Sequence, residues 1–395
     1  MTDASEVHQA SRPAGSIAIQ CVVDHGRFRS LRDDWQHLFM RCPGLTPFNS
    51  WEWLFSWWQA YGVERQLRIL LVHVDGTLAG IAPLCINRET TALRTPCRVL
   101  RFIGDGSFDS DHLGFLIDPA RQTLVMQLVE DWLRHDRDWD VLAMREITGS
   151  SGLNAAMRDL AGNLGLHFRI DESACAVLDL PASYEEFMHS RQSRFRTKVR
   201  SLTRKIDQGD IVFETQCGPD DLRRKLRSLF DLHQRRWNAV GQPGVFGSST
   251  KRLFYAHFVP RFARNGWLRL YSLRRGQDYV AHQLCFGIAG TTYLLQEGFD
   301  VSDPTASFGQ MLRAAVVRHL IDLGETRYDF LGGFSPHKED WGAKSGTMIH
   351  VLVARDNLKA LLYFNAPAWR ESIAAKAKRI LPEPVLRWLR RAGAA

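Results

Sequence analysis

The chain has 395 residues, of which 45% are hydrophobic, 24% charged and 11% aromatic. This composition is typical of a folded globular protein and excludes a disordered one, and the length favours two domains or one fused pair. A formal net charge of +8 and a sequence pI near 9.2 favour anionic partners: phosphates, acidic sugars, nucleic acid or an acidic lipid surface.

The seven cysteines are scattered and form no C-x-x-C pair. We therefore expect neither a zinc cluster nor a disulfide framework, no metal site, and a reducing, cytoplasmic compartment. Residues 1–15 are polar and are expected to form a flexible tail, without the basic start and apolar run of a signal peptide. No apolar stretch approaches the roughly 20 residues that span a bilayer, so we expect no integral membrane segment.

The first half of the chain predicts an α/β unit. Tryptophans recur at helical spacings near residue 55, which most simply indicates core packing. Asp75-Gly76 lies between two apolar runs and is typical of a hairpin turn. In chain order the predicted elements are a strand at 17–23, helix at 33–58, strands at 67–74, 78–86 and 99–102, a helix at 122–134 and a strand at 139–144.

The second half repeats this order. Strands are expected at 268–273, 279–286 and 291–296, then a turn at 307–310, a helix at 311–323 and a strand at 328–331. Self-similarity on the scale of a domain points to a duplicated α/β unit.

A basic amphipathic helix is predicted between the halves, at 189–207. Phe195, Val199, Leu202 and Ile206 form one apolar stripe, and arginines and lysines occupy the other faces. The helix either packs as a solvated linker or faces an anion at the border of the substrate cleft. A second basic stretch, 366–391, either packs on the second half or makes a peripheral contact with anionic lipid.

Six segments in order resemble the CelD-like, or BioF2-like, acetyltransferase family, which is itself similar to the Fem aminoacyltransferases. They are TPFNSWEWLFSWWQAYG, GIAPL, SDHLGFLID, RFRTKVRSLTRKI, AHQLCF and YDFLGGFSPHKEDWGAK, and the resemblance spans about residues 25–350. It implies an α/β protein with a tandem GNAT fold, in which two mixed-sheet halves are joined by the basic helix. It also implies transfer of an acyl group from acetyl-CoA or another acyl-CoA, usually to an amine.

The resemblance and the patterns together divide the chain into five parts. These are a tail at 1–15, an N-terminal GNAT-like half at 16–180, the basic linker helix at 181–210, a catalytic C-terminal half at 211–355 and a basic helical extension at 356–395.

Acyl transfer from a thioester to an amine needs a cradle for the donor's pyrophosphate, a base, and donors for the developing oxyanion. A glycine turn at a helix N-terminus suits the phosphates, and Ser307, Phe308, Gly309 and Gln310 lie at such a turn. Relatives commonly carry Pro-Gly there, so a reshaped donor turn is expected.

Three residues compete for the role of base. Glu297 ends a predicted strand where GNAT enzymes often present a carboxylate, and it suits the role if burial raises its pKa toward neutrality. His282 and Asp329 are the alternatives, and Asp329 is otherwise a structural anchor for the Gly332-Gly333 turn.

The remaining candidates are contacts to substrate. Lys338 suits an oxyanion or an acceptor phosphate, and the family's C-terminal motif of aspartate, glycine, lysine and an aromatic is met at Asp329, Gly332, Gly333, Lys338 and Trp341. The motif Asp109-Ser-Asp111 resembles a metal-binding D-x-D, but the family resemblance makes Asp111 and His112 acceptor contacts. Arg196 and Arg200 on the basic helix complete the expected substrate-binding residues.

The sequence therefore predicts a cytoplasmic acyl-CoA-dependent N-acyltransferase that modifies an amine on a sugar, polysaccharide or cell-envelope precursor. Direct attack on the thioester is expected, because no cysteine lies in a motif suited to a covalent intermediate. Two alternatives stay open: Fem-like transfer from a charged tRNA, and a non-catalytic accessory role in a polysaccharide synthase system. No G-x-S-x-G, P-loop or H-E-x-x-H motif occurs, which excludes serine hydrolase, NTPase and zincin assignments.

Overall fold

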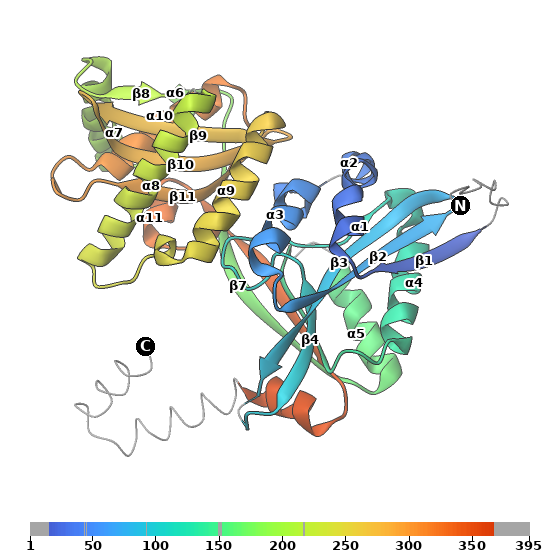
Figure 1. The fold of residues 1–395 in the computed structure, drawn as a ribbon. Coiled ribbons are helices and arrows are strands. Elements are labelled where there is room, and N and C mark those ends of the chain that lie inside the picture. Colours follow the sequence, from blue (N-terminus) through green and yellow to red (C-terminus); the bar gives the residue numbers. More distant parts are fainter. Residues whose placement is uncertain are drawn as a thin grey trace, which may run out of the picture.

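The fold is seen in a computed structural model that describes residues 16–42, 44, 46–91, 93–148, 152–215 and 218–366. The tail predicted at 1–15 and the part of the C-terminal extension from 367 to 395 lie outside the described residues. Two lobes are joined by long central strands, with α3 and α9 facing each other between them (Figure 1). Among the described residues, no helix is both long and apolar enough to cross a membrane.

The first half begins with a strand and three helices and continues through a strand-rich unit. Its elements are β1 (Ile17–Val22), α1 (His25–Ser30), α2 (Arg32–Arg41), α3 (Trp51–Tyr61), β2 (Arg65–Val74), β3 (Thr77–Thr90), β4 (Pro96–Phe102), β5 (Leu116–Ile117), α4 (Gln122–His135), β6 (Val141–Thr148), α5 (Leu153–Leu164) and β7 (His167–Asp179).

The second half begins with four helices and a short strand. Its elements are α6 (Tyr184–His189), α7 (Ser193–Asp207), β8 (Val212–Glu214), α8 (Pro219–Ala239), α9 (Ser249–Arg264), β9 (Leu268–Arg275), β10 (Asp278–Ile288), β11 (Thr291–Phe299), α10 (Phe308–Asp322), β12 (Arg327–Gly332), α11 (Pro336–Asp340) and β13 (Lys344–Ala354).

Within the described residues, all strands belong to one 13-stranded mixed sheet, ordered β1-β2-β3-β4-β6-β13-β7-β12-β11-β10-β9-β8, with β5 beside β3. The duplicated unit is confirmed. An antiparallel run β2-β3-β4 is followed by α4 and a strand β6 parallel to β4, and β9-β10-β11 is followed by α10 and a strand β12 parallel to β11. The α/β class with a mixed sheet in each half is also confirmed.

The two units are joined edge to edge. β13, from the end of the chain, lies between β6 and β7, and β7 pairs on its other side with β12. The strands β7 and β13 and the helices α5, α8 and α9 follow no pattern recognised in the sequence. The basic helix α7 packs on α10 of the second half and does not bridge the two halves.

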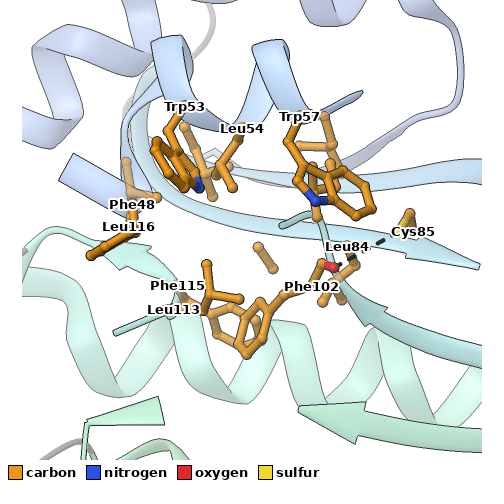
Figure 2. Close-up of a cluster of buried hydrophobic side chains, with 14 of the residues drawn as sticks. Phe48, Trp53, Leu54, Trp57, Leu84, Cys85, Phe102, Leu113, Phe115 and Leu116 are labelled. Carbon is orange, nitrogen blue, oxygen red and sulfur yellow. Dashed lines mark hydrogen bonds between the residues drawn. The ribbon is translucent and has the colours of Figure 1, made fainter. Parts of the chain in front are cut away.

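The predicted hairpin forms as expected. Asp75 and Gly76 both have positive φ, 53° and 75°, which is the backbone of a type I′ turn and matches the twist of β2 and β3. The aromatic stripe is core, as its simplest interpretation predicted: Trp53 and Trp57 are fully buried under α3, above Phe102, Phe115 and their neighbours (Figure 2).

The aromatic core crosses from one half to the other. The Trp53 ring lies 4.9 Å from Phe254 and 4.8 Å from Phe258 of α9, centroid to centroid, and its Nε1 donates to Ser110 Oγ at 2.9 Å. One helix of the first half therefore packs on a helix of the second and also holds the loop that precedes His112.

This loop, residues 104–112, is tied to both halves by its acidic side chains. Asp105 pairs with Arg101 at 3.1 Å. Asp109, fully buried, pairs with Lys251 of α9 at 2.8 Å and accepts a hydrogen bond from Tyr255 at 2.8 Å. Lys251 Nζ also donates to the Ser107 carbonyl at 2.9 Å. The loop is thus held in place by a buried ion pair with the second half.

We expect Lys251→Met to destabilise the protein by about 3–5 kcal/mol, because the Asp109 carboxylate would be left buried without its cation. Adding Asp109→Asn should restore much of the loss. Urea unfolding at pH 7 measures both. The control is Lys344→Met, since Lys344 pairs with Asp179 at an exposed site and should change stability by about 1 kcal/mol or less. A similar small loss for Lys251→Met would contradict the structural role of the pair.

Candidate active site

The candidate site lies where the parallel strands β11 and β12 separate. They pair only over Thr291–Tyr293 and Arg327–Asp329, although β11 continues to Phe299 and β12 to Gly332. Side chains alternate across a strand. Tyr293 lies against the core of the first half, whereas Tyr328 and Phe330 lie in the core that contains α10. The gap is therefore bordered by a different set of groups on each face of the sheet.

On the face toward the first half, three of the predicted residues come together. His112 Nε2 lies 3.0 Å from Asp329 Oδ2, and Asp329 Oδ1 accepts a hydrogen bond from the Leu331 amide at 2.8 Å. Asp111 accepts from the Gly332 amide at 2.7 Å. Since Asp109 and Asp111 each have their own protein partners, the D-x-D motif holds the loop to the second half.

Burial and charge shape the titration of this group. Burial lowers the pKa of His112, but the hydrogen bond to Asp329 and the charges of Asp329 and Asp111 outweigh burial, so the pKa is raised. Glu146 of β6 shares a hydrogen bond with Asp111, and burial together with the Asp111 charge raises its pKa to about 8. Burial raises the pKa of Asp111 as well, so this pair of carboxyl groups holds a proton more readily than two separate carboxyl groups would.

Backbone strain is concentrated around the same groups. His112, Glu146 and Leu331 have φ of 52°, 57° and 58°, and Ser307, before α10, has φ of 51°. Non-glycine residues rarely adopt this left-handed conformation, and such residues gather at functional sites. This strain identifies the region independently of its charges.

A cavity of about 630 Å³ opens beside His112 and Asp329. It is bounded by β7, β11, β12 and β13, and its lining includes Thr148, Glu172, Cys175, Tyr293 and Arg327. The cavity is partly polar and large enough for a small amine or a single sugar unit.

On the opposite face, Glu297 is held in ion pairs. Its Oε2 accepts from Arg313 at 2.8 Å and from Gln283 at 2.7 Å, and its Oε1 lies 3.6 Å from Arg236. Burial raises its pKa, but Arg313, Gln283 and Arg236 outweigh this and lower it. The condition for Glu297 to act as base, a pKa raised toward neutrality, is not met because two cations stabilise its charged form.

His282 lies away from the gap. It is fully buried, shares a hydrogen bond between its Nδ1 and Ser272 Oγ at 2.8 Å, and packs against Tyr279. Burial, followed by the charge of Lys225, lowers its pKa to about 3. His282 is thus a neutral core residue, and the structure does not bring it to Asp329 or Glu297.

Lys338 closes the turn after β12. Its Nζ donates to the carbonyl oxygens of Phe330, Gly332 and Gly333 at 3.0, 2.9 and 2.6 Å. These three bonds use all the donors of an ammonium group. Burial and the charge of Arg313 lower the pKa of Lys338. In this arrangement Lys338 positions the backbone beside Asp329, and its donors are not directed at an oxyanion.

The predicted donor turn lies at the N-terminus of the 15-residue helix α10. Ser307 takes the left-handed conformation that begins the helix, and Gly309 lies against Phe299, whose ring would be 2.7 Å from any Cβ at that position. The first amides of a helix have no partner within it and favour an anion. The turn presents a helix N-terminus beside Phe299 of β11.

A cleft of about 690 Å³ runs between α7, α10 and α11, and Gln310 and Trp341 line it. Its basic side chains are Arg191, Arg194 and Lys198.

The two arginines predicted on α7 do not line this cleft. Arg196 donates to the Arg191 carbonyl at 2.7 Å, and Arg200 is exposed. Trp341 is almost fully buried, packs on the Phe195 ring at 5.0 Å, and forms part of the cleft wall.

Several residues of the site were missed from the sequence. Glu146 follows a strand without any motif, and Arg236 is one of many arginines on α8. Arg313 carried a signal: it is the single charge in the otherwise apolar run Met311–Val317 of a predicted helix. A buried arginine in such a run requires a partner, which here is Glu297.

The second half of the chain matches a known protein family. Residues 193–339 match the family described as acetyltransferase (GNAT) domain. The match runs from the start of α7 into α11 and so includes both strands of the gap and all of α10. A search of curated proteins found no match.

Solved structures share the fold at low sequence identity. FemX superposes with a TM-score of 0.57 at 12% identity, over 80% of this chain and 95% of FemX. The C-terminal domain of a putative lysylphosphatidylglycerol synthetase from Agrobacterium fabrum gives 0.52 at 12%, over 87% and 96%. A conserved protein of unknown function from Bacteroides thetaiotaomicron gives 0.54 at 14%, over 85% and 100%. The second half therefore matches an acetyltransferase (GNAT) domain, the whole chain shares its fold with these structures, and the chain is an acyltransferase.

Proposed function

We propose that this chain is an acyl-CoA-dependent N-acyltransferase of the CelD-like kind, which acylates an amine on a sugar or cell-envelope precursor. The observation that carries the proposal is the gap between β11 and β12, which opens beside the N-terminus of α10. A thioester donor needs such an opening for its reactive end and a helix N-terminus for its phosphates.

The surroundings of α10 suit the phosphates of the donor. The unpartnered amides of its first turn, at Phe308 and Gly309, favour negative charge. Arg194 and Lys198 of α7 lie in the cleft that Gln310 of α10 also lines. The cleft is lined by Glu339 and Asp340 as well as by these cations, so the support for a nucleotide diphosphate such as that of coenzyme A comes from Arg194, Lys198 and the helix N-terminus.

The acceptor is placed in the 630 Å³ cavity on the other face of the sheet. An amine there attacks the thioester carbonyl carbon that reaches the gap, so a C–N bond forms while the C–S bond breaks. The proton of the amine passes to His112, whose Nε2 is held by Asp329 and whose Nδ1 lies 3.3 Å from the Thr148 hydroxyl. The departing thiolate leaves as the free thiol after protonation.

The acidic surroundings of His112 favour an amine acceptor over an anionic one. Asp329 and Glu172 line the cavity, whose lining also includes one cation, Arg327, and Asp111 lies beside them at the Gly332 amide. A cationic amine is attracted there and must then lose a proton, which the raised pKa of His112 suits. The roles proposed here are His112 as base, Asp329 as its partner, and Asp111, Glu146 and Lys338 as positioning residues.

An alternative donor is a charged tRNA, which the exposed basic side chains of α7 favour. Arg194, Lys198, Arg200, Arg204 and Lys205 are on this helix, beside the cleft. Phosphate contacts of this kind bind nucleic acid with strong salt dependence.

A cytoplasmic location is proposed from the cysteines, because those that the structure describes are all free thiols.

Donor binding is testable with coenzyme A, acetyl-CoA and longer acyl-CoAs by isothermal titration calorimetry. We expect binding by the wild type and a loss of roughly tenfold or more in Gly309→Ala, because the new Cβ would displace the first turn of α10 from Phe299. The control is Gly162→Ala in α5, where nothing lies within 4 Å of a new Cβ. Absence of binding to every acyl-CoA, with salt-sensitive tRNA binding instead, would contradict the proposed donor.

The base is testable by titrating the imidazole of His112 by NMR and by turnover with a panel of amino sugars. We expect a pKa above the ordinary value of about 6.5 in the wild type and a lower one in Asp329→Asn, since Asp329 stabilises the imidazolium. Turnover should rise as pH increases through the His112 pKa, and this rise should move to lower pH in Asp329→Asn.

Loss of the imidazole in His112→Ala should reduce kcat by about 10²- to 10⁴-fold and remove the pH dependence. The control is His37→Gln, an exposed histidine of α2. A pH profile that is the same in His112→Ala as in the wild type would show that another group is the base.

A further inference from the structure

The gap between β11 and β12 contains an arginine that reaches both strands. Arg313 of α10 donates to Glu297 of β11 at 2.8 Å, and its guanidinium lies 5.3 Å from the centroid of the Phe330 ring of β12. A second guanidinium nitrogen lies 2.6 Å from His337 Nε2. The Arg313 side chain is 7% exposed, and its Nε has no hydrogen-bond partner within the described residues.

A second arginine enters from α8. Arg236 stacks on Phe299 of β11, with its guanidinium 4.3 Å from the ring centroid, and lies 3.6 Å from Glu297 Oε1. The distance to Glu297 is longer than a hydrogen bond, and within the described part of the chain this guanidinium donates no hydrogen bond. The stacking therefore holds Arg236 in place while its N–H donors stay available.

The charges in the gap do not balance. Two guanidiniums face one carboxylate, that of Glu297, and the Lys338 ammonium lies close enough for Arg313 to lower its pKa. Burial followed by the neighbouring charge of Arg313 lowers the pKa of His337, which leaves it neutral. The pKa of Arg236 is itself lowered, by burial first and opposed by Glu297. Buried or half-buried cations in excess favour an anionic ligand.

Arg236 and Arg313 lie apart from the helix N-terminus that is proposed to hold the phosphates of the donor. Arg313 is four to five residues beyond the amides of Phe308 and Gly309, so its backbone lies roughly 6–8 Å along α10 from them, at 1.5 Å per residue. It lies deeper in the gap than the amides proposed to hold the pyrophosphate. An anion at Arg313 and Arg236 would therefore belong to the acyl end of the donor.

We propose that Arg236 and Arg313 form a carboxylate subsite, so that the preferred donor is the thioester of a dicarboxylic acid. This inference rests on the proposed acyl-CoA donor and names the class of acyl group. The distal carboxylate binds the two guanidiniums, one of which it shares with Glu297, and takes no part in the reaction. The thioester carbon still forms the new C–N bond and loses the thiol, and the product is an amide with a free terminal carboxylate.

The test compares succinyl-CoA with butyryl-CoA. Both have four-carbon acyl chains and the same phosphates, so they differ at the chain end, where one has a carboxylate and the other a methyl group. Calorimetry on the full chain should show that the wild type binds succinyl-CoA roughly tenfold more tightly, the effect of one charged hydrogen-bonded contact. Coenzyme A serves as the reference ligand without an acyl group.

Two substitutions should move the preference in opposite directions. Arg236→Gln should reduce the succinyl-to-butyryl ratio toward one and leave coenzyme A binding unchanged within about twofold, since the lost cation contacts only the acyl end. Glu297→Gln should raise the ratio, because the competing carboxylate is removed. Arg235→Gln, an exposed neighbour on α8 with the same change in charge, should keep the wild-type ratio.

Three other outcomes would overturn the carboxylate subsite, and they differ in what they imply for the proposed acyl-CoA donor. Equal or tighter binding of butyryl-CoA by the wild type would overturn the carboxylate subsite and leave the acyl-CoA donor intact. An equal loss for succinyl-CoA, butyryl-CoA and coenzyme A in Arg236→Gln would assign Arg236 to the phosphates and also overturn the subsite. Failure of all three ligands to bind the wild type would overturn the proposed donor and the subsite with it.

Discussion

The pairing of β7 on both of its edges is the constraint on which the site depends. One edge carries β13, which joins it to the sheet of the first half, and the other carries β12 of the second half. Because a backbone ladder fixes neighbouring strands about 4.8 Å apart and in one register, the halves have a defined relative position. That position brings the loop ending at His112 against Asp329 and Gly332.

The side chains of β12 lie among different functional groups on the two faces of the sheet. Its Asp329 side chain lies with His112 and Asp111, in surroundings dominated by carboxylates, whereas Phe330 lies with Arg313 of α10. An amine is favoured on the first face and an anionic donor on the second. The two faces come together where β11 and β12 stop pairing, beyond Tyr293 and Asp329.

Around the contact between His112 and Asp329, hydrogen bonds from buried charged side chains offset the free-energy cost of strained backbone. Left-handed backbone at His112, Glu146 and Leu331 costs about 1–3 kcal/mol at each residue and persists only where neighbouring contacts hold it. The contacts are specific: Asp111 accepts from the Gly332 amide, Asp329 accepts from the Leu331 amide, and Lys338 holds the carbonyl groups beyond them. The lysine singled out by its motif therefore belongs to the scaffold of the site.

The type and order of most elements could be predicted from the amino-acid sequence, because helices and strands follow from local periodicity. The Asp75-Gly76 hairpin, the basic helix α7, the turn before α10 and the duplicated unit all depend on neighbours within a few residues. It also placed Asp111, His112 and Asp329 among the candidates. It could not show that they meet.

Which candidates share a face of the sheet, and which charged groups surround each of them, depends on the three-dimensional fold. His112 and Asp329 are 217 positions apart, and their contact depends on β7 and β13, whose pairing joins strands distant in sequence. Glu297 was expected to be a base with a raised pKa, but Arg313 and Arg236 reach it from two helices and lower that pKa. His282 lies on β10, which is buried on both faces, and it pairs with Ser272 in the core. Burial and long-range partners set these properties, and neither is encoded in the spacing of residues along the chain.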